Sequence, residues 1–68
     1  MNTQEWKEHL SPKQAQVVDM LIDGHSVRWI AQELLIVPRT VENHIQTAKF
    51  KLNKKGYVFE KHYGVRKI

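Results

Sequence analysis

Three side chains that can hydrogen-bond to nucleic-acid bases recur at helical spacing in the middle of the chain. Arg39, Asn43 and Gln46 fall on one side of a helix of 3.6 residues per turn, and Phe50 falls on the same side. An arginine can donate two hydrogen bonds to guanine, and an asparagine or a glutamine can pair in the same bidentate way with adenine. The spacing therefore predicts a helix face that contacts base edges, with an ordinary solvated helix face as the alternative.

Basic residues gather in the half of the chain that holds this face. Up to Pro38, five acidic residues outnumber three basic ones, whereas after Pro38 eight basic residues outnumber two acidic ones. The net charge of +4 is thus the sum of −2 and +6. This asymmetry favours a polyanion as partner over a merely solvated basic surface. It predicts phosphate contacts by four lysines: Lys49, Lys51, Lys54 and Lys55.

The first element that must position this face is a helix over residues 12–23. Ser11 can cap it, Pro12 suits the first helical position, and Gln14 completes a capping box. Gly24 stands where a left-handed residue would end it.

A helix-turn-helix is predicted from Val27 to Leu52. Its first helix follows the candidate cap Ser26 and is short, and its second begins at Pro38, which cannot continue the preceding helix. Apolar residues at helical spacing predict the core of all three helices. They are Val17, Val18 and Leu21, then Val27, Ile30, Ala31 and Leu34, then Val41, Ile45, Ala48 and Leu52.

The two ends of the chain show weaker patterns. Residues 1–10 lack clear periodicity and are interpreted as an arm, although Trp6 and Leu10 could cap the core if this arm is partly helical. After a basic turn ending at residue 56, the segment from Tyr57 to Tyr63 fits a two-turn helix or an alternating strand, and helix is favoured. A frayed tail follows. The prediction is an all-α, three- to four-helix bundle with a short last helix, divided into residues 1–10, 11–56 and 57–68.

Composition excludes several classes of protein. A chain of 68 residues makes one domain, and without cysteine it has neither disulfides nor thiolate metal ligands. Its four histidines show no metal-ligand spacing, and its acidic residues form no catalytic pair. No apolar run is long enough to span a membrane. We therefore expect a cytoplasmic protein that is not an enzyme and has no metal, cofactor, small-molecule substrate or membrane partner.

The residues from Leu10 to Leu52 resemble the LuxR-type (GerE-like) helix-turn-helix family of bacterial transcription regulators. The resemblance rests on four pieces in the family's order and spacing. They are Leu10-Ser11-Pro12-Lys13, Ile30-Ala31-Gln32-Glu33-Leu34, Thr40-Val41-Glu42-Asn43-His44-Ile45 and Lys51-Leu52. The resemblance implies a tetrahelical domain that binds DNA, commonly as a dimer.

Carried over by position, the resemblance implies base contacts at Glu42, Asn43 and Gln46. It implies phosphate contacts at Arg28, Arg39, Thr40 and His44, whereas the helix face favours a base contact for Arg39. The predicted base-contacting set is Arg39, Glu42, Asn43 and Gln46. The chain departs from the family pattern at several positions, among them Lys49-Phe50, which reverses the family's usual order of aromatic then basic residue. Glu42 replaces a usual lysine, Leu35 stands where glycine is common, and Val37 stands where a serine or threonine cap is common.

Four aromatic side chains are candidates for a dimer or partner surface. Trp29 falls opposite the apolar stripe of its helix and either packs within the chain or contacts a phosphate or a partner. Phe50, Phe59 and Tyr63, together with Tyr57, could stack on bases, but such aromatics more often complete a core or a dimer contact.

These patterns together predict a sequence-specific regulator of transcription that binds double-stranded DNA. The alternative is a protein-interaction module of the same shape that binds RNA polymerase, a sigma factor or another regulator without contacting DNA. A homodimer and a contact with RNA polymerase are both left open by the sequence.

Overall fold

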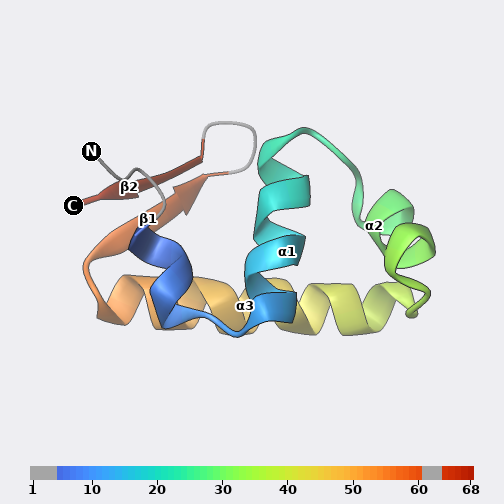
Figure 1. Cartoon of the computed structure of the whole chain (residues 1–68), viewed down its shortest axis with the longest axis horizontal. Coiled ribbons are helices and arrows are strands. Elements are labelled where there is room, and N and C mark those ends of the chain that lie inside the picture. Colours follow the sequence, from blue (N-terminus) through green and yellow to red (C-terminus); the bar gives the residue numbers. More distant parts are fainter. Residues whose placement is uncertain (1–4, 61–63) are drawn as a thin grey trace.

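The computed structural model describes residues 5–60 and 64–68. These residues form, in chain order, the 3-10 helix η1 (Glu5–His9), the helices α1 (Pro12–Ile22), α2 (Val27–Leu34) and α3 (Pro38–Lys54), and the strands β1 (Tyr57–Glu60) and β2 (Gly64–Lys67). Figure 1 shows α3 along the longest axis, α1 crossing it steeply, and α2 and the strand pair near its opposite ends. Within the described ranges, no helix combines the length and apolarity needed to cross a membrane.

The start of α1 carries the predicted capping box. The backbone N–H of Gln14 donates to the Ser11 hydroxyl at 3.2 Å, and the Ser11 N–H donates to the Gln14 side-chain oxygen at 3.1 Å. At the other end, Gly24 has a φ of 97° and its N–H donates to the carbonyl of Leu21. The predicted first helix is therefore confirmed and ends at Ile22.

The turn between α2 and α3 is built from apolar residues. Ser26 caps α2 as predicted, because its hydroxyl accepts the N–H of Trp29. The helix ends at Leu35, which has the left-handed φ of 57° that glycine adopts more easily. Val37 then occupies the cap position of α3, where its side chain has no acceptor to offer, and Pro38 is the first helical residue. The predicted helix-turn-helix is confirmed.

Buried side chains in the described residues form two clusters, one toward each end of α3. The turn-end cluster holds Val17, Leu21, Ile30, Ala31 and Val41. The hairpin-end cluster holds Trp6, Val18, Ala48, Leu52 and Tyr57. Phe59 packs against both clusters, so it joins them into one core. The predicted stripes of α1, α2 and α3 supply most of these residues and are confirmed.

The favoured helix over residues 57–63, and with it the short last helix of the bundle, is wrong. β1 pairs with β2 in an antiparallel hairpin in which Tyr57 faces Lys67 and Phe59 faces Val65. Gly56 and Gly64 have positive φ values of 83° and 101°, which end α3 and begin the return strand. The tail predicted as frayed is therefore strand β2. Residues 61–63, including Tyr63, lie outside the described residues.

The N-terminal segment is more than an arm. Residues 5–9 form η1, and the Trp6 side chain is only 4% exposed in the hairpin-end cluster. Lys7 forms an ion pair with Asp19 of α1, which ties η1 to the first long helix. Trp6 thus caps the core, as the partly helical interpretation expected. Side chains of η1, the three helices and β1 thus contribute to one core.

Candidate nucleic-acid interface

The candidate base-contacting residues all lie on the exposed side of α3. Arg39, Glu42, Asn43 and Gln46 are exposed, while the opposite side of the same helix buries Val41, Ala48 and Leu52 completely. Burial of that stripe fixes the rotation of α3 about its axis, because turning it would expose three apolar side chains. The polar face is therefore held outward by the core.

The candidate phosphate contacts are spread over three places. Arg28 is exposed in the first turn of α2, and Thr40 and His44 are half-buried on one flank of α3. Lys49, Lys54 and Lys55 are exposed toward the C-terminal end of α3. The structure thus places cations near both ends of the polar face.

Lys51 differs from the other lysines. It is half-buried, and its ammonium group donates to the side-chain oxygen of Gln14 at 3.1 Å. That oxygen also accepts the N–H of Ser11, so Lys51 links α3 to the capping box of α1. The contact gives Lys51 a structural partner that the charge pattern did not predict.

Two exposed lysines lie near aromatic rings. The ammonium group of Lys54 is 5.2 Å from the ring centroid of Phe50, and that of Lys49 is 5.9 Å from the ring centroid of Phe59. Both distances are within the range of cation–π attraction, which is weak at exposed sites. The contact of Lys49 brings the middle of α3 against β1, since Phe59 lies in that strand.

The candidate partner aromatics have different surroundings. Phe50 is 64% exposed on α3, and Trp29 is 38% exposed and stacks on His25 with ring centroids 3.6 Å apart. Trp29 thus packs within the chain on one side and leaves the other open. Phe59 is half-buried between the two clusters, so its packing is that of a core residue rather than of a partner surface. Tyr63 lies outside the described residues.

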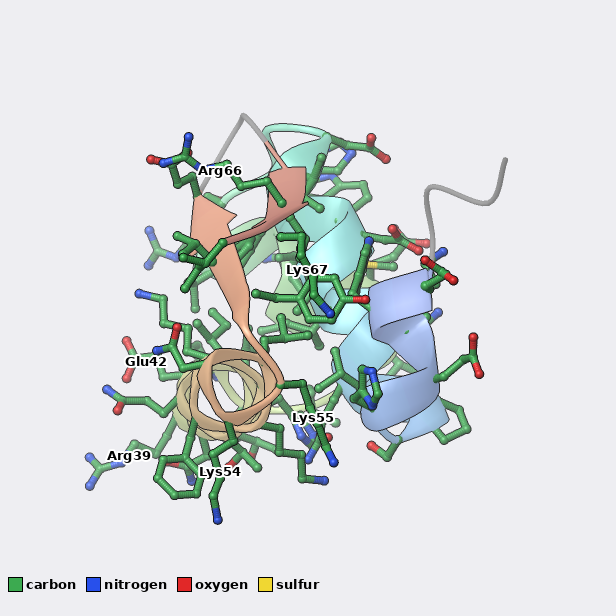
Figure 2. All side chains as sticks on the ribbon, turned by 90° about the vertical axis from the view of Figure 1, so that its left-hand side faces the viewer. Arg39, Glu42, Lys54, Lys55, Arg66 and Lys67 are labelled. Atoms are coloured by element: carbon green, nitrogen blue, oxygen red, sulfur yellow. The ribbon has the colours of Figure 1, made fainter. Side chains whose placement is uncertain are left out.

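The hairpin adds two cations for which the sequence analysis predicted no role, Arg66 and Lys67. Both are exposed on β2. Figure 2, which looks along α3, shows Arg66 on the same side as Arg39 and Glu42, with Lys54 and Lys55 beside the end of α3.

The alternation of Tyr57 and Phe59 between two glycines was the signal that could have revealed the strand. Among residues 5–60 and 64–68, no group of three acidic, histidine or cysteine side chains could hold a metal ion.

Comparisons with known proteins place these features in a family context. The family model GerE, described as "bacterial regulatory proteins, luxR family", matches residues 8–58. The spore germination protein GerE of Bacillus subtilis (strain 168) is 38% identical over 50 residues, which cover 74% of this chain and 68% of that protein. No solved structure matches the chain significantly.

Proposed function

Since the chain belongs to the LuxR family of bacterial regulatory proteins, we propose that it binds double-stranded DNA sequence-specifically and thereby regulates transcription. The observation that carries the proposal is the exposed polar face of α3 on a helix whose rotation is fixed by burial. At 17 residues and about 1.5 Å per residue, α3 is about 25 Å long. The major groove is about 12 Å wide and accepts a helix.

Base contacts come from the first half of α3. Arg39 is suited to guanine, and Asn43 and Gln46 are suited to adenine, because each side chain can form two hydrogen bonds with that base. Glu42 is suited to cytosine, whose amino group is a donor, and it would be repelled by phosphates. The proposed preference is therefore set by amide and carboxylate contacts rather than by the lysine usual in the family.

Phosphate contacts come from cations on either side of that helix half. Arg28 at the start of α2 and three lysines at the end of α3 are exposed, and exposed cations attract the DNA backbone without distinguishing bases. Thr40 and His44 are assigned to the same role from the flank of α3. If about four phosphates are neutralised, the logarithm of affinity falls with the logarithm of salt concentration at a slope of about −3.6.

Selection of binding sites from random duplex DNA tests the proposal. The purified chain should enrich one motif, and two mirrored half-sites would identify a dimer. Asn43→Ala should reduce the difference in binding free energy between the selected site and other duplexes by about 1 to 3 kcal/mol. Lys54→Ala should weaken binding to all duplexes about equally. Failure to enrich a motif, together with a flat salt response, would contradict the proposal. If Asn43→Ala, like Lys54→Ala, weakened binding to all duplexes equally, the base contact of Asn43 would be contradicted.

A second candidate function is docking onto another protein, such as RNA polymerase or a sigma factor. It is favoured by the exposed apolar turn, where Leu35 is 91% and Val37 is 61% exposed. Exposed apolar side chains grouped together are typical of interaction surfaces. Capture of a defined partner by the chain, combined with no DNA binding at low salt, would favour this function over the first.

A further inference from the structure

We propose that the C-terminal hairpin is a second DNA-contacting element, which contacts the phosphate backbone beside the groove occupied by α3 through Arg66. This inference rests on the proposed DNA binding and extends it to a part of the chain outside the helix-turn-helix. The family model ends at residue 58, within β1, so β2 and both of its cations lie beyond the matched region.

The hairpin is held firmly beside α3. Tyr57 and Phe59 of β1 point into the core, and Val65 of β2 packs with them in the hairpin-end cluster. The backbone N–H of Ile68 donates to the carbonyl of Gly56 at 2.7 Å, which closes the open end of the hairpin. Because these contacts involve both strands, the hairpin has a fixed position relative to the base-contacting face.

That position suits a backbone contact. Val58 pairs with Arg66, so Arg66 lies on the face of the sheet opposite Tyr57 and Phe59. Figure 2 shows Arg66 on the side of the hairpin away from α1, the same side on which Arg39 and Glu42 leave α3. With α3 in the groove, Arg66 would meet the strand that borders it.

The two cations of β2 lie on opposite faces of the hairpin, because neighbouring residues of a strand alternate between its faces. The ammonium group of Lys67 is 4.6 Å from the ring centroid of Tyr57, and its side chain passes close to Gly56. Lys67 therefore lies on the face of Tyr57, beside the turn that follows α3. Of these two cations, Arg66 is the one that shares a side with Arg39 and Glu42.

Arg66 remains available to a phosphate although it has an acidic neighbour. Its Nε is 3.5 Å from a carboxylate oxygen of Glu60, and both side chains are well exposed. Such exposed pairs are weak and exchange readily with other partners. The planar guanidinium group has further N–H donors, which suit the oxygens of a phosphate. The Glu60 carboxylate should repel DNA. Its removal should therefore change the affinity in the opposite direction from the removal of Arg66.

The experiment measures binding of fluorescent duplexes by anisotropy over a salt series, using the selected site and a random duplex. Arg66→Gln should weaken binding to both duplexes by about threefold or more. It should also make the slope of the logarithm of affinity against the logarithm of salt concentration shallower by about 0.9, so that affinity falls about threefold less between about 50 and about 200 mM salt. Glu60→Gln should strengthen binding, a gain that unfolding could not produce.

The matched control is Lys13→Gln, which removes one exposed cation from the first turn of α1. Circular dichroism of each variant verifies the fold. The inference is overturned if the wild type binds DNA and Arg66→Gln behaves like Lys13→Gln, or if the loss is confined to particular base sequences. If the wild type binds no DNA, the proposed function itself fails.

Discussion

At the turn end of α3, the buried residues come from three consecutive helices, whereas at the hairpin end residues of η1 and β1 join those of α1 and α3. Val17, Ile30 and Val41 meet at the turn end, and each belongs to a helix with its own start signal. At the hairpin end, Trp6 of η1 and Tyr57 of β1 share one cluster although nearly the whole chain separates them. The first end is thus specified by local signals and the second by long-range packing.

Removal of Trp6 is the strongest test of that difference. Trp6→Ala should lower the free energy of unfolding by about 3 to 5 kcal/mol, because it empties the hairpin-end cluster of its largest side chain. Urea unfolding followed by circular dichroism measures this change. Trp6→Phe, which keeps part of the apolar area, should cost less. A loss below about 1 kcal/mol would mean that residues 5–9 behave as the loose arm that the sequence suggested.

The same difference explains what the sequence could predict. Ser11, Pro12 and Gln14 are neighbours in the chain, so their pattern alone identified the start of α1 and the structure confirmed it. Phe59 and Tyr63 at i, i+4 fit a helix, whereas Tyr57, Phe59 and Tyr63 fit one side of a strand. The choice depended on pairing with β2, which lies outside that segment. The cations of β2 had no predicted role because their strand was predicted as a tail. The polar face of α3 was predicted correctly because it is defined by a buried stripe on the same helix.

The capping contacts at the starts of α1 and α2 differ in number. Ser11→Ala should lower the free energy of unfolding by about 1 kcal/mol, because it removes the acceptor for the Gln14 N–H. The other half of the capping box remains, because the Gln14 side-chain oxygen still accepts the Ser11 N–H and the ammonium group of Lys51. Ser26→Ala removes a single capping bond of the shorter α2 and serves as the comparison. Thermal unfolding should rank Ser11→Ala as the more damaging variant, and the reverse order would show that the capping box adds nothing.

At the start of α3, a substitution should stabilise the fold rather than destabilise it. Val37 has the extended backbone of a helix cap, with φ −79° and ψ 152°, but its side chain cannot accept a hydrogen bond. Val37→Ser should therefore raise the free energy of unfolding by about 0.5 to 1 kcal/mol, which corresponds to a few degrees in the melting temperature. Because Val37 is exposed, little apolar burial is lost. Val37→Ala, which adds no acceptor, should give no gain, and an equal gain from both variants would contradict the capping explanation.

The smallest expected effect concerns Leu35, the residue that ends α2. Its φ of 57° places a branched side chain in the left-handed region, which costs about 1 kcal/mol relative to glycine. Leu35→Gly removes that strain but adds backbone freedom to the unfolded chain. The free energy of unfolding should therefore rise by about 0.5 kcal/mol. Leu35→Ala keeps the strain and should leave stability unchanged, because the leucine side chain is almost fully exposed.

The same pair of Leu35 variants separates the two candidate functions. If α3 binds DNA through its polar face, Leu35→Gly should raise the melting temperature by a few degrees and leave affinity for DNA unchanged, since Leu35 lies outside that face. If the apolar turn docks onto a protein, both Leu35→Gly and Leu35→Ala should weaken capture of that partner by removing the same exposed side chain. A drop in stability with Leu35→Gly would instead mean that the leucine contributes contacts that its exposure does not suggest. The strained leucine would then be retained for folding rather than for recognition.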